Sequence, residues 1–156
     1  MKYVSTRNNS NEYNFDEVFI KGLADDGGLY VPKSIIKYNS KDLSKLKDLN
    51  YNDLSTEILN HFTSDFISRD ELSTLVSKSY SKFREKEVVK ISNVGKIKIL
   101  ELFHGPTLAF KDVAMQFIGN LYDYYLSKND KKINIIVATS GDTGAAAIDA
   151  IKGKSN

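Results

Sequence analysis

The chain has 156 residues, of which 41% are hydrophobic and 27% charged, and its formal net charge at pH 7 is +2. This composition is that of a folded globular protein, and the near balance of charges gives no sign of a nucleic-acid-binding surface. The lack of cysteine excludes disulfides and cysteine-based metal or catalytic sites, and no apolar run approaches the ~20 residues of a membrane span. The first residues lack the apolar core of a signal peptide, so we expect a cytoplasmic protein that binds neither membranes nor nucleic acid.

Residues 1–83 predict a mostly helical N-terminal domain. Ser68 and Glu71 are spaced as a capping box, and the helix behind them places Leu72, Leu75, Val76 and Tyr80 on one face. The other expected elements are a short strand at 2–6, a helix capped by Asn14, a turn at 24–28 followed by an extended segment at 29–32, a helix capped by Ser40 and running to Leu49, and a helix from Asn52 or Asp53 through Phe62.

Residues 84–156 predict the beginning of an α/β domain. An apolar run at 133–138, bounded by turn residues, is typical of a parallel strand buried on both faces. Too few residues follow it for another crossover to a parallel neighbour, so we expect this domain to be incomplete. The other expected elements are strands at 88–91 and 96–103 separated by a turn at 92–95, a helix at 108–127, a turn at 139–144 and a helix at 145–151.

Lys111 is the first candidate functional residue. With Thr107 as the helix cap, Lys111 lies in or just after the first turn, at the positive end of the helix dipole. The residues on its side of the helix are Ala114, Met115, Ile118 and Tyr122, whereas Asp112, Gln116, Asn120 and Asp123 line the other side, which we expect to be the solvated one.

Burial and the helix dipole both disfavour the ammonium form of Lys111, so we expect a lowered pKa and a neutral amine. Such an amine forms Schiff bases and abstracts protons. The alternative is a lysine whose stem covers apolar surface while its ammonium reaches water.

The segment Ser140–Gly144 is the second candidate. Its glycines and small hydroxyl residues lie between the expected strand and the last helix, where backbone amides and the helix dipole favour a carboxylate or phosphate. The alternative is simple capping of the helix by Asp142 or Thr143. The two histidines, His61 and His104, lack a metal-ligand spacing, so we expect no metal site, and His104 is compatible with a plain loop residue.

Two longer motifs give these candidates a family context. Residues 101–112 read ELFHGPTLAFKD and residues 138–146 read ATSGDTGAA, and together they resemble the threonine synthase family. Residues 3–7 and 22–32 resemble the N-terminal segment of the same family, so the resemblance runs from residue 1 to about residue 150. Asn8 is a departure, because many members place a glycine there.

The resemblance implies an enzyme that uses pyridoxal 5'-phosphate and has the tryptophan-synthase-β-like fold, which is fold type II among such enzymes. It implies that Lys111 is catalytic and holds the cofactor as a Schiff base, with Phe110 beside the cofactor ring. The implied reaction is the last step of threonine biosynthesis, in which O-phospho-L-homoserine and water become L-threonine and phosphate. The residues implied to meet the substrate carboxylate are Ser140, Gly141, Asp142, Thr143 and Gly144, with Asp142 also on the hydroxyl side of the cofactor ring.

The family also implies parts that this sequence does not contain. A glycine-rich cup for the cofactor phosphate and a partner for the pyridine nitrogen are expected further along, so we expect an N-terminal fragment that does not turn over substrate alone. The alternatives are a threonine-synthase-like phospholyase, a serine/threonine dehydratase or a non-catalytic N-terminal module. The sequence does not indicate the oligomeric state.

Overall fold

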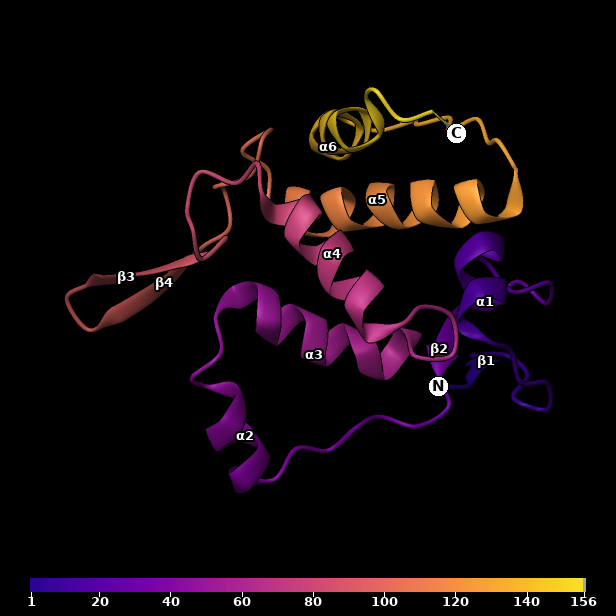
Figure 1. Cartoon of the computed structure of the whole chain (residues 1–156), viewed down its shortest axis with the longest axis horizontal. Coiled ribbons are helices and arrows are strands. Elements are labelled where there is room, and N and C mark those ends of the chain that lie inside the picture. The colour runs from indigo at the N-terminus through magenta and orange to yellow at the C-terminus, as the bar shows by residue number, and fades with distance from the viewer. Residues whose placement is uncertain (156) are drawn as a thin grey trace. The chain divides into compact units, whose positions relative to one another are not determined.

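The computed structural model describes residues 1–155 (Figure 1). The chain divides into two compact units, Met1–Ser73 and a second unit from Thr74 onward, and the boundary falls within helix α4 (Arg69–Tyr80). Each unit combines helices with one two-stranded antiparallel sheet. This mixture of helices and strands confirms the α/β class.

The first unit is organised around Tyr3. Its strands β1 (Tyr3–Ser5) and β2 (Tyr30–Pro32) pair antiparallel. The Tyr3 hydroxyl donates to the carbonyl of Phe62 at 3.0 Å, and the Tyr3 ring lies 6.1 Å from that of Phe15. Burial, and then the charge of Asp65, raises the pKa of Tyr3 to about 12. The helices of this unit that precede α4 are α1 (Phe15–Lys21), α2 (Ser40–Leu46) and α3 (Tyr51–Thr63).

Asparagines cap the first three helices. The prediction of Asn14 as the cap of α1 is confirmed. The predicted caps of α2 and α3 were wrong by one to three residues, because Asn39 caps α2 and Asn50 caps α3. The Asn50 side-chain oxygen accepts from the amide of Asp53 at 3.0 Å. Asparagine is among the strongest N-caps, so it takes this role ahead of the residues that follow it.

The predicted capping box of α4 is confirmed. Ser68 Oγ lies 2.7 Å from Glu71 Oε2, and the Ser68 backbone N–H donates to the same oxygen at 3.3 Å. The predicted apolar face is also buried, because Leu72 and Val76 are both 0% exposed. The beginning and the buried face of α4 therefore both follow from local sequence.

The second unit begins with a hairpin of β3 (Lys90–Val94) and β4 (Ile97–Glu101). Val94 pairs with Ile97, so the turn consists of residues 95–96, and the predicted turn at 92–95 was wrong. Gly95 has φ +60°, the left-handed backbone that a tight hairpin turn needs, and this centres the turn on the glycine. Val88 also has a positive φ, so the strand starts only at Lys90.

Two helices complete the second unit, α5 (Asp112–Asn129) and α6 (Asp142–Ile151), and they pack against each other (Figure 1). Gly119 permits this packing, because a Cβ there would lie 2.7 Å from the carbonyl oxygen of Ala150. The apolar centre of the unit includes Leu121, which is 1% exposed, and Ala146, which is 0% exposed.

The predicted strand at 133–138 is absent. These residues form no strand, and Ile136 is 95% exposed. A parallel strand exists only when a neighbour supplies its hydrogen bonds, and residues 1–155 contain no strand that pairs with this segment. The apolar run therefore remains an irregular connection between α5 and α6.

Candidate functional site

The turn that carries Lys111 wraps around the carboxylate of Asp112, which is 0% exposed. Asp112 accepts from the backbone N–H of Thr107 at 2.8 Å and from its hydroxyl at 2.7 Å. Gly105 packs so closely that an added Cβ would lie 2.4 Å from the Asp112 Cβ. These contacts tie both ends of the turn together and fix the backbone on either side of Lys111.

Helix α5 starts later than predicted, because the turn comes first. Residues 108–109 form a bend and 110–111 a turn, and Leu108 has φ +66°, a conformation that bulky side chains rarely adopt. The helix begins at Asp112 with Lys111 as the N-cap residue, so the expected cap at Thr107 and start at Leu108 were wrong. The Thr107 hydroxyl donates to the side chain of Asp112, the first residue of α5, whereas the side chain of an N-cap residue accepts from a backbone amide of the helix.

The Lys111 side chain is half-buried and borders an open apolar hollow. Its Nζ lies 4.2 Å from the centroid of the Phe110 ring, and Phe110 is 59% exposed. The hollow has a volume of about 340 Å³, and its other lining residues are Leu102, Val113, Ala114 and Met115. Among the described residues that line it, Lys111 contributes the one charged group.

The predicted faces of α5 were wrong. On the Lys111 side, Ala114 is exposed and Met115 is half-buried, as are Ile118 and Tyr122. The predicted solvated side is instead mostly buried, with Asp112, Gln116 and Asn120 at 5% exposure or less and Asp123 half-buried.

Hydrogen bonds within the unit explain why polar side chains on α5 can be buried. Gln116 donates to Asp149 of α6 at 2.7 Å, and Asn120 donates to Ser79 of α4 at 3.0 Å. Buried polar groups that are paired in this way carry little of the usual desolvation cost. The apolar side of α5 borders another open hollow, of about 200 Å³, lined also by residues of the unpaired segment at 135–137.

The second candidate lies at the N-terminus of α6. This helix starts at Asp142 with Gly141, at φ +147°, as its N-cap, so the predicted start at Ala145 and caps at Asp142 or Thr143 were wrong. Thr139 supplies the capping oxygen, which accepts from the amides of Gly141 at 2.9 Å and Gly144 at 3.3 Å.

Two amides at this helix end stay available. Within residues 1–155, the backbone N–H groups of Asp142 and Thr143 donate no hydrogen bond. Ser140 and Asp142 are exposed. Free amides at a helix N-terminus, where the dipole is positive, favour an anion. The geometry is thus compatible with an anion-binding loop as well as with simple capping.

The two candidate groups are neighbours without direct contact. Met115 lines both the hollow of Lys111 and the hollow that reaches Thr143. Within the described part of the chain, no hydrogen bond, ion pair or ring contact joins Lys111 to Ser140–Gly144. A ligand that binds both groups must therefore extend across the region of Met115.

His104 has a more specific environment than a plain loop residue. Its Nε2 lies 2.9 Å from Glu101 Oε2, and its backbone carbonyl accepts from the amide of Arg84 at 2.9 Å. Glu101 also accepts from the hydroxyl of Ser92. The Ser92 and His104 hydrogen bonds, aided by the charge of Lys90, lower the pKa of Glu101 below its usual 4.5. This cluster joins the hairpin to the turn of Lys111.

We expect Glu101→Gln to destabilise the second unit more at about pH 6 than at about pH 3.5. A carboxylate with a lowered folded-state pKa contributes stability above its unfolded pKa of 4.5, and this contribution is lost as the pH falls through the folded-state value. Urea unfolding of both proteins at the two pH values measures the difference. An equal difference at both would contradict the role of the Glu101 charge.

Within residues 1–155, no group of three or more histidine, aspartate and glutamate side chains is placed to hold a metal ion. In the same range, no helix is long and apolar enough to cross a lipid bilayer.

The comparisons with known proteins agree with these motifs. The family model described as "Threonine synthase N terminus" matches residues 2–80, about half of the chain. The chain therefore belongs to the threonine synthase family.

Individual relatives extend this similarity beyond residue 80. Threonine synthase of Schizosaccharomyces pombe is 42% identical over 164 residues, covering 99% of this chain and 32% of the relative. Threonine synthase-like 2 of Pongo abelii is 39% identical over 158 residues, covering 100% and 33%. The crystal structure of pyridoxal-phosphate-bound threonine synthase from Brucella melitensis superposes with a TM-score of 0.94 at 39% identity, covering 100% of this chain and 34% of that one. The chain thus spans about a third of the length of these relatives.

Proposed function

We propose that this chain carries the cofactor lysine and an anion loop of a threonine synthase. In this proposal the whole protein is a pyridoxal-phosphate-dependent lyase that converts O-phospho-L-homoserine and water to L-threonine and phosphate. The observation that carries it is Lys111, the one charged residue among those lining the apolar hollow at the start of α5, within the motif ELFHGPTLAFKD. Similarity to threonine synthases supports the assignment.

The residues present fit part of the cofactor. Lys111 offers a primary amine, Phe110 an exposed aromatic face beside it, and the α6 N-terminus free amides. Pyridoxal phosphate supplies an electron sink for carbanion chemistry when it is bound. The apolar side chains that line the hollow beside Lys111 offer water few hydrogen-bonding partners on that side of the amine.

The chain's own residues then have distinct roles. Lys111 moves protons at the α and β carbons of the substrate, while phosphate leaves from the γ carbon and water adds at the β carbon. The amides of Asp142 and Thr143, with the Ser140 hydroxyl, orient the substrate carboxylate, and Gly141 and Gly144, whose amides donate to Thr139, shape the loop around it. With the cofactor bound, Asp142 would also contact the hydroxyl side of its ring. The Thr107–Asp112 hydrogen bonds hold the turn, and so the Lys111 amine, in position.

The proposal includes the organisation of the chain and its location. Residues 1–83 form the N-terminal domain, and residues 84–156 begin the cofactor-binding domain. An enzyme of amino-acid biosynthesis with a small-molecule substrate is expected in the cytoplasm.

Borohydride reduction in the presence of pyridoxal phosphate tests the site directly. We expect the adduct on Lys111 when the reduced chain is mapped by peptide mass. The surface lysines Lys96 and Lys98 of the same unit serve as internal controls. Adduct spread evenly over surface lysines would favour the alternative of a non-catalytic module.

The reaction is tested with the protein expressed from the complete reading frame. Supplied with O-phospho-L-homoserine, it should release threonine and phosphate in equal amounts, and we expect no turnover from residues 1–156 alone. The alternative candidate is a threonine-synthase-like phospholyase without synthase activity. Release of phosphate with 2-oxobutyrate in place of threonine would identify that alternative.

A further inference from the structure

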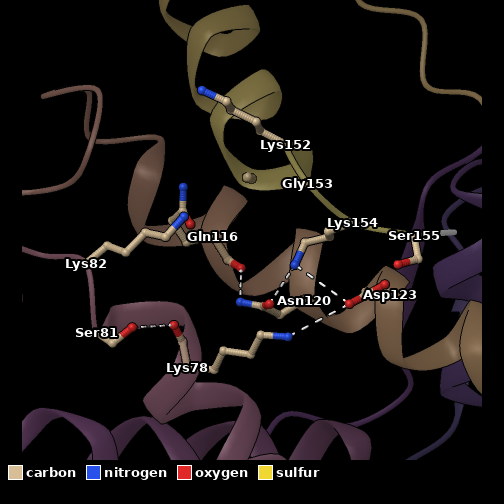
Figure 2. A pocket seen from close by; sticks show the side chains of 11 residues that line it. Lys78, Ser81, Lys82, Gln116, Asn120, Asp123, Lys152, Gly153, Lys154 and Ser155 are labelled. Atoms are coloured by element: carbon tan, nitrogen blue, oxygen red, sulfur yellow. Dashed lines mark hydrogen bonds and ion pairs between the residues drawn. The ribbon is translucent and has the colours of Figure 1, made fainter.

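A polar pocket lies in the same unit (Figure 2), and its lining shares no residue with the Lys111 hollow. It is a pocket of about 260 Å³ formed by the end of α4, the middle of α5 and the residues after α6. Its α5 residues, Gln116, Asn120 and Asp123, share one helix face by their spacing of four and three. This face differs from that of Met115, Ile118 and Tyr122, which border the apolar hollow.

Asn120 and Lys154 both line the pocket and are hydrogen-bonded to each other. Asn120 is 5% exposed, and its amide nitrogen donates to the Ser79 hydroxyl and to the Gln116 carbonyl, both at 3.0 Å. These bonds fix its side-chain oxygen, which accepts from Lys154 Nζ at 2.7 Å. The Lys154 side chain is 15% exposed, so its ammonium is held largely out of water. Figure 2 shows this amine pointing into the polar cluster.

Positive charge in the pocket exceeds negative charge. Lysines 78, 82, 152 and 154 line it, and among the described lining residues Asp123 is the one carboxylate. Asp123 lies 3.9 Å from Lys78 and 4.0 Å from Lys154, whereas Lys82 and Lys152 have no carboxylate within ion-pair distance in residues 1–155. Burial, and then the charges of Lys78 and Lys82, lower the pKa of Lys154, whereas Asp123 raises it. One carboxylate therefore does not balance the surrounding ammonium groups.

We propose that this pocket binds a compact oxyanion of the phosphate class. Its volume is below the ~300–1,000 Å³ of sites for drug-sized ligands, which suits a small ion or a small phosphate monoester. Lysines act as point charges that suit multivalent oxyanions, and a partly desolvated setting strengthens each interaction. The proposal does not depend on the function assigned to Lys111.

Phosphorus-31 NMR titration of the chain with inorganic phosphate and, separately, with methyl phosphate at constant ionic strength tests the proposal. We expect saturable binding that Lys78→Gln weakens about tenfold, because one charge-assisted contact is lost. The Lys78 side chain is 59% exposed, so this change should leave the fold intact, which circular dichroism checks. The matched control is Lys96→Gln, an exposed lysine in the β3–β4 turn, and its affinity should equal that of the unchanged chain.

Asp123→Asn supplies a test in the opposite direction. Removal of the competing carboxylate should tighten phosphate binding by roughly threefold. Tighter binding of methyl phosphate than of inorganic phosphate would identify a monoester as the preferred ligand, and weaker binding would identify the free ion. Equal affinities of the Lys78→Gln and Lys96→Gln proteins, or no saturable binding up to ~10 mM phosphate, would overturn the proposal.

Discussion

Lys111→Ala in the protein from the complete reading frame is expected to lower turnover of O-phospho-L-homoserine by at least about 10²–10⁴-fold, the usual contribution of a positioned acid–base group. It should also remove the visible absorbance of lysine-bound pyridoxal phosphate. The reason is that the proposed function gives Lys111 both roles, as the amine that bonds to the cofactor and, once released, as the base. Stopped assays of threonine and phosphate, together with absorbance spectra, measure the two effects.

Lys98→Ala is the matched control, because Lys98 is an exposed lysine on β4 of the same unit. It should keep normal turnover and the normal spectrum. Added primary amines should partly restore proton transfer in Lys111→Ala but not in a protein that has lost its fold. An unchanged spectrum in Lys111→Ala would contradict the assignment and place the cofactor bond on another lysine.

Asp112→Ala is expected to lower the free energy of unfolding by about 2–3 kcal/mol, because the backbone N–H and hydroxyl of Thr107 lose a buried acceptor. The turn that holds Lys111 should loosen at the same time, so the rate of Lys111 labelling by pyridoxal phosphate and borohydride should change. Urea unfolding and labelling kinetics measure these effects.

The control for Asp112 is Glu87→Ala, which removes an exposed carboxylate from the same unit. Asp112→Asn should be intermediate, because its amide keeps one acceptor oxygen for Thr107. If Asp112→Ala destabilised the chain no more than Glu87→Ala, the buried hydrogen bonds would not organise the turn.

Local signals in the sequence predicted the elements that depend on local interactions. The capping box of Ser68 and Glu71 and the buried face with Leu72 and Val76 need no information beyond a few neighbouring residues. The faces of α5 could not be read in this way. Gln116 is buried because Asp149, more than thirty residues away, accepts its hydrogen bond. The periodicity of hydrophobic residues along α5 cannot predict a partner on another helix.

The candidate site was predicted through its motifs, and its supporting residues were missed. Asp112 follows Lys111 directly. An acidic residue at the start of a helix, shortly after a threonine, is a pattern from which the Thr107–Asp112 hydrogen bond could have been predicted. Thr139 precedes Gly141 by two residues, the spacing of a hydroxyl turn, which could have identified it as the cap of α6. The missing strand at 133–138 agrees with the expectation of an incomplete domain, because a parallel strand forms only with a partner strand and too few residues follow this segment to supply one.

The two faces of α5 should tolerate different substitutions as relatives diverge. Asn120 donates and accepts in fixed directions, so we expect sequence drift at Gln116 and Asn120 to be confined to side chains with the same hydrogen-bonding geometry. Met115 and Ile118 have apolar side chains that pack without directional hydrogen bonds. Exchanges among apolar residues of similar volume at these positions should therefore change stability little. We therefore expect two rates of sequence change on this helix, on faces about 0.4 of a turn apart at roughly 100° per residue.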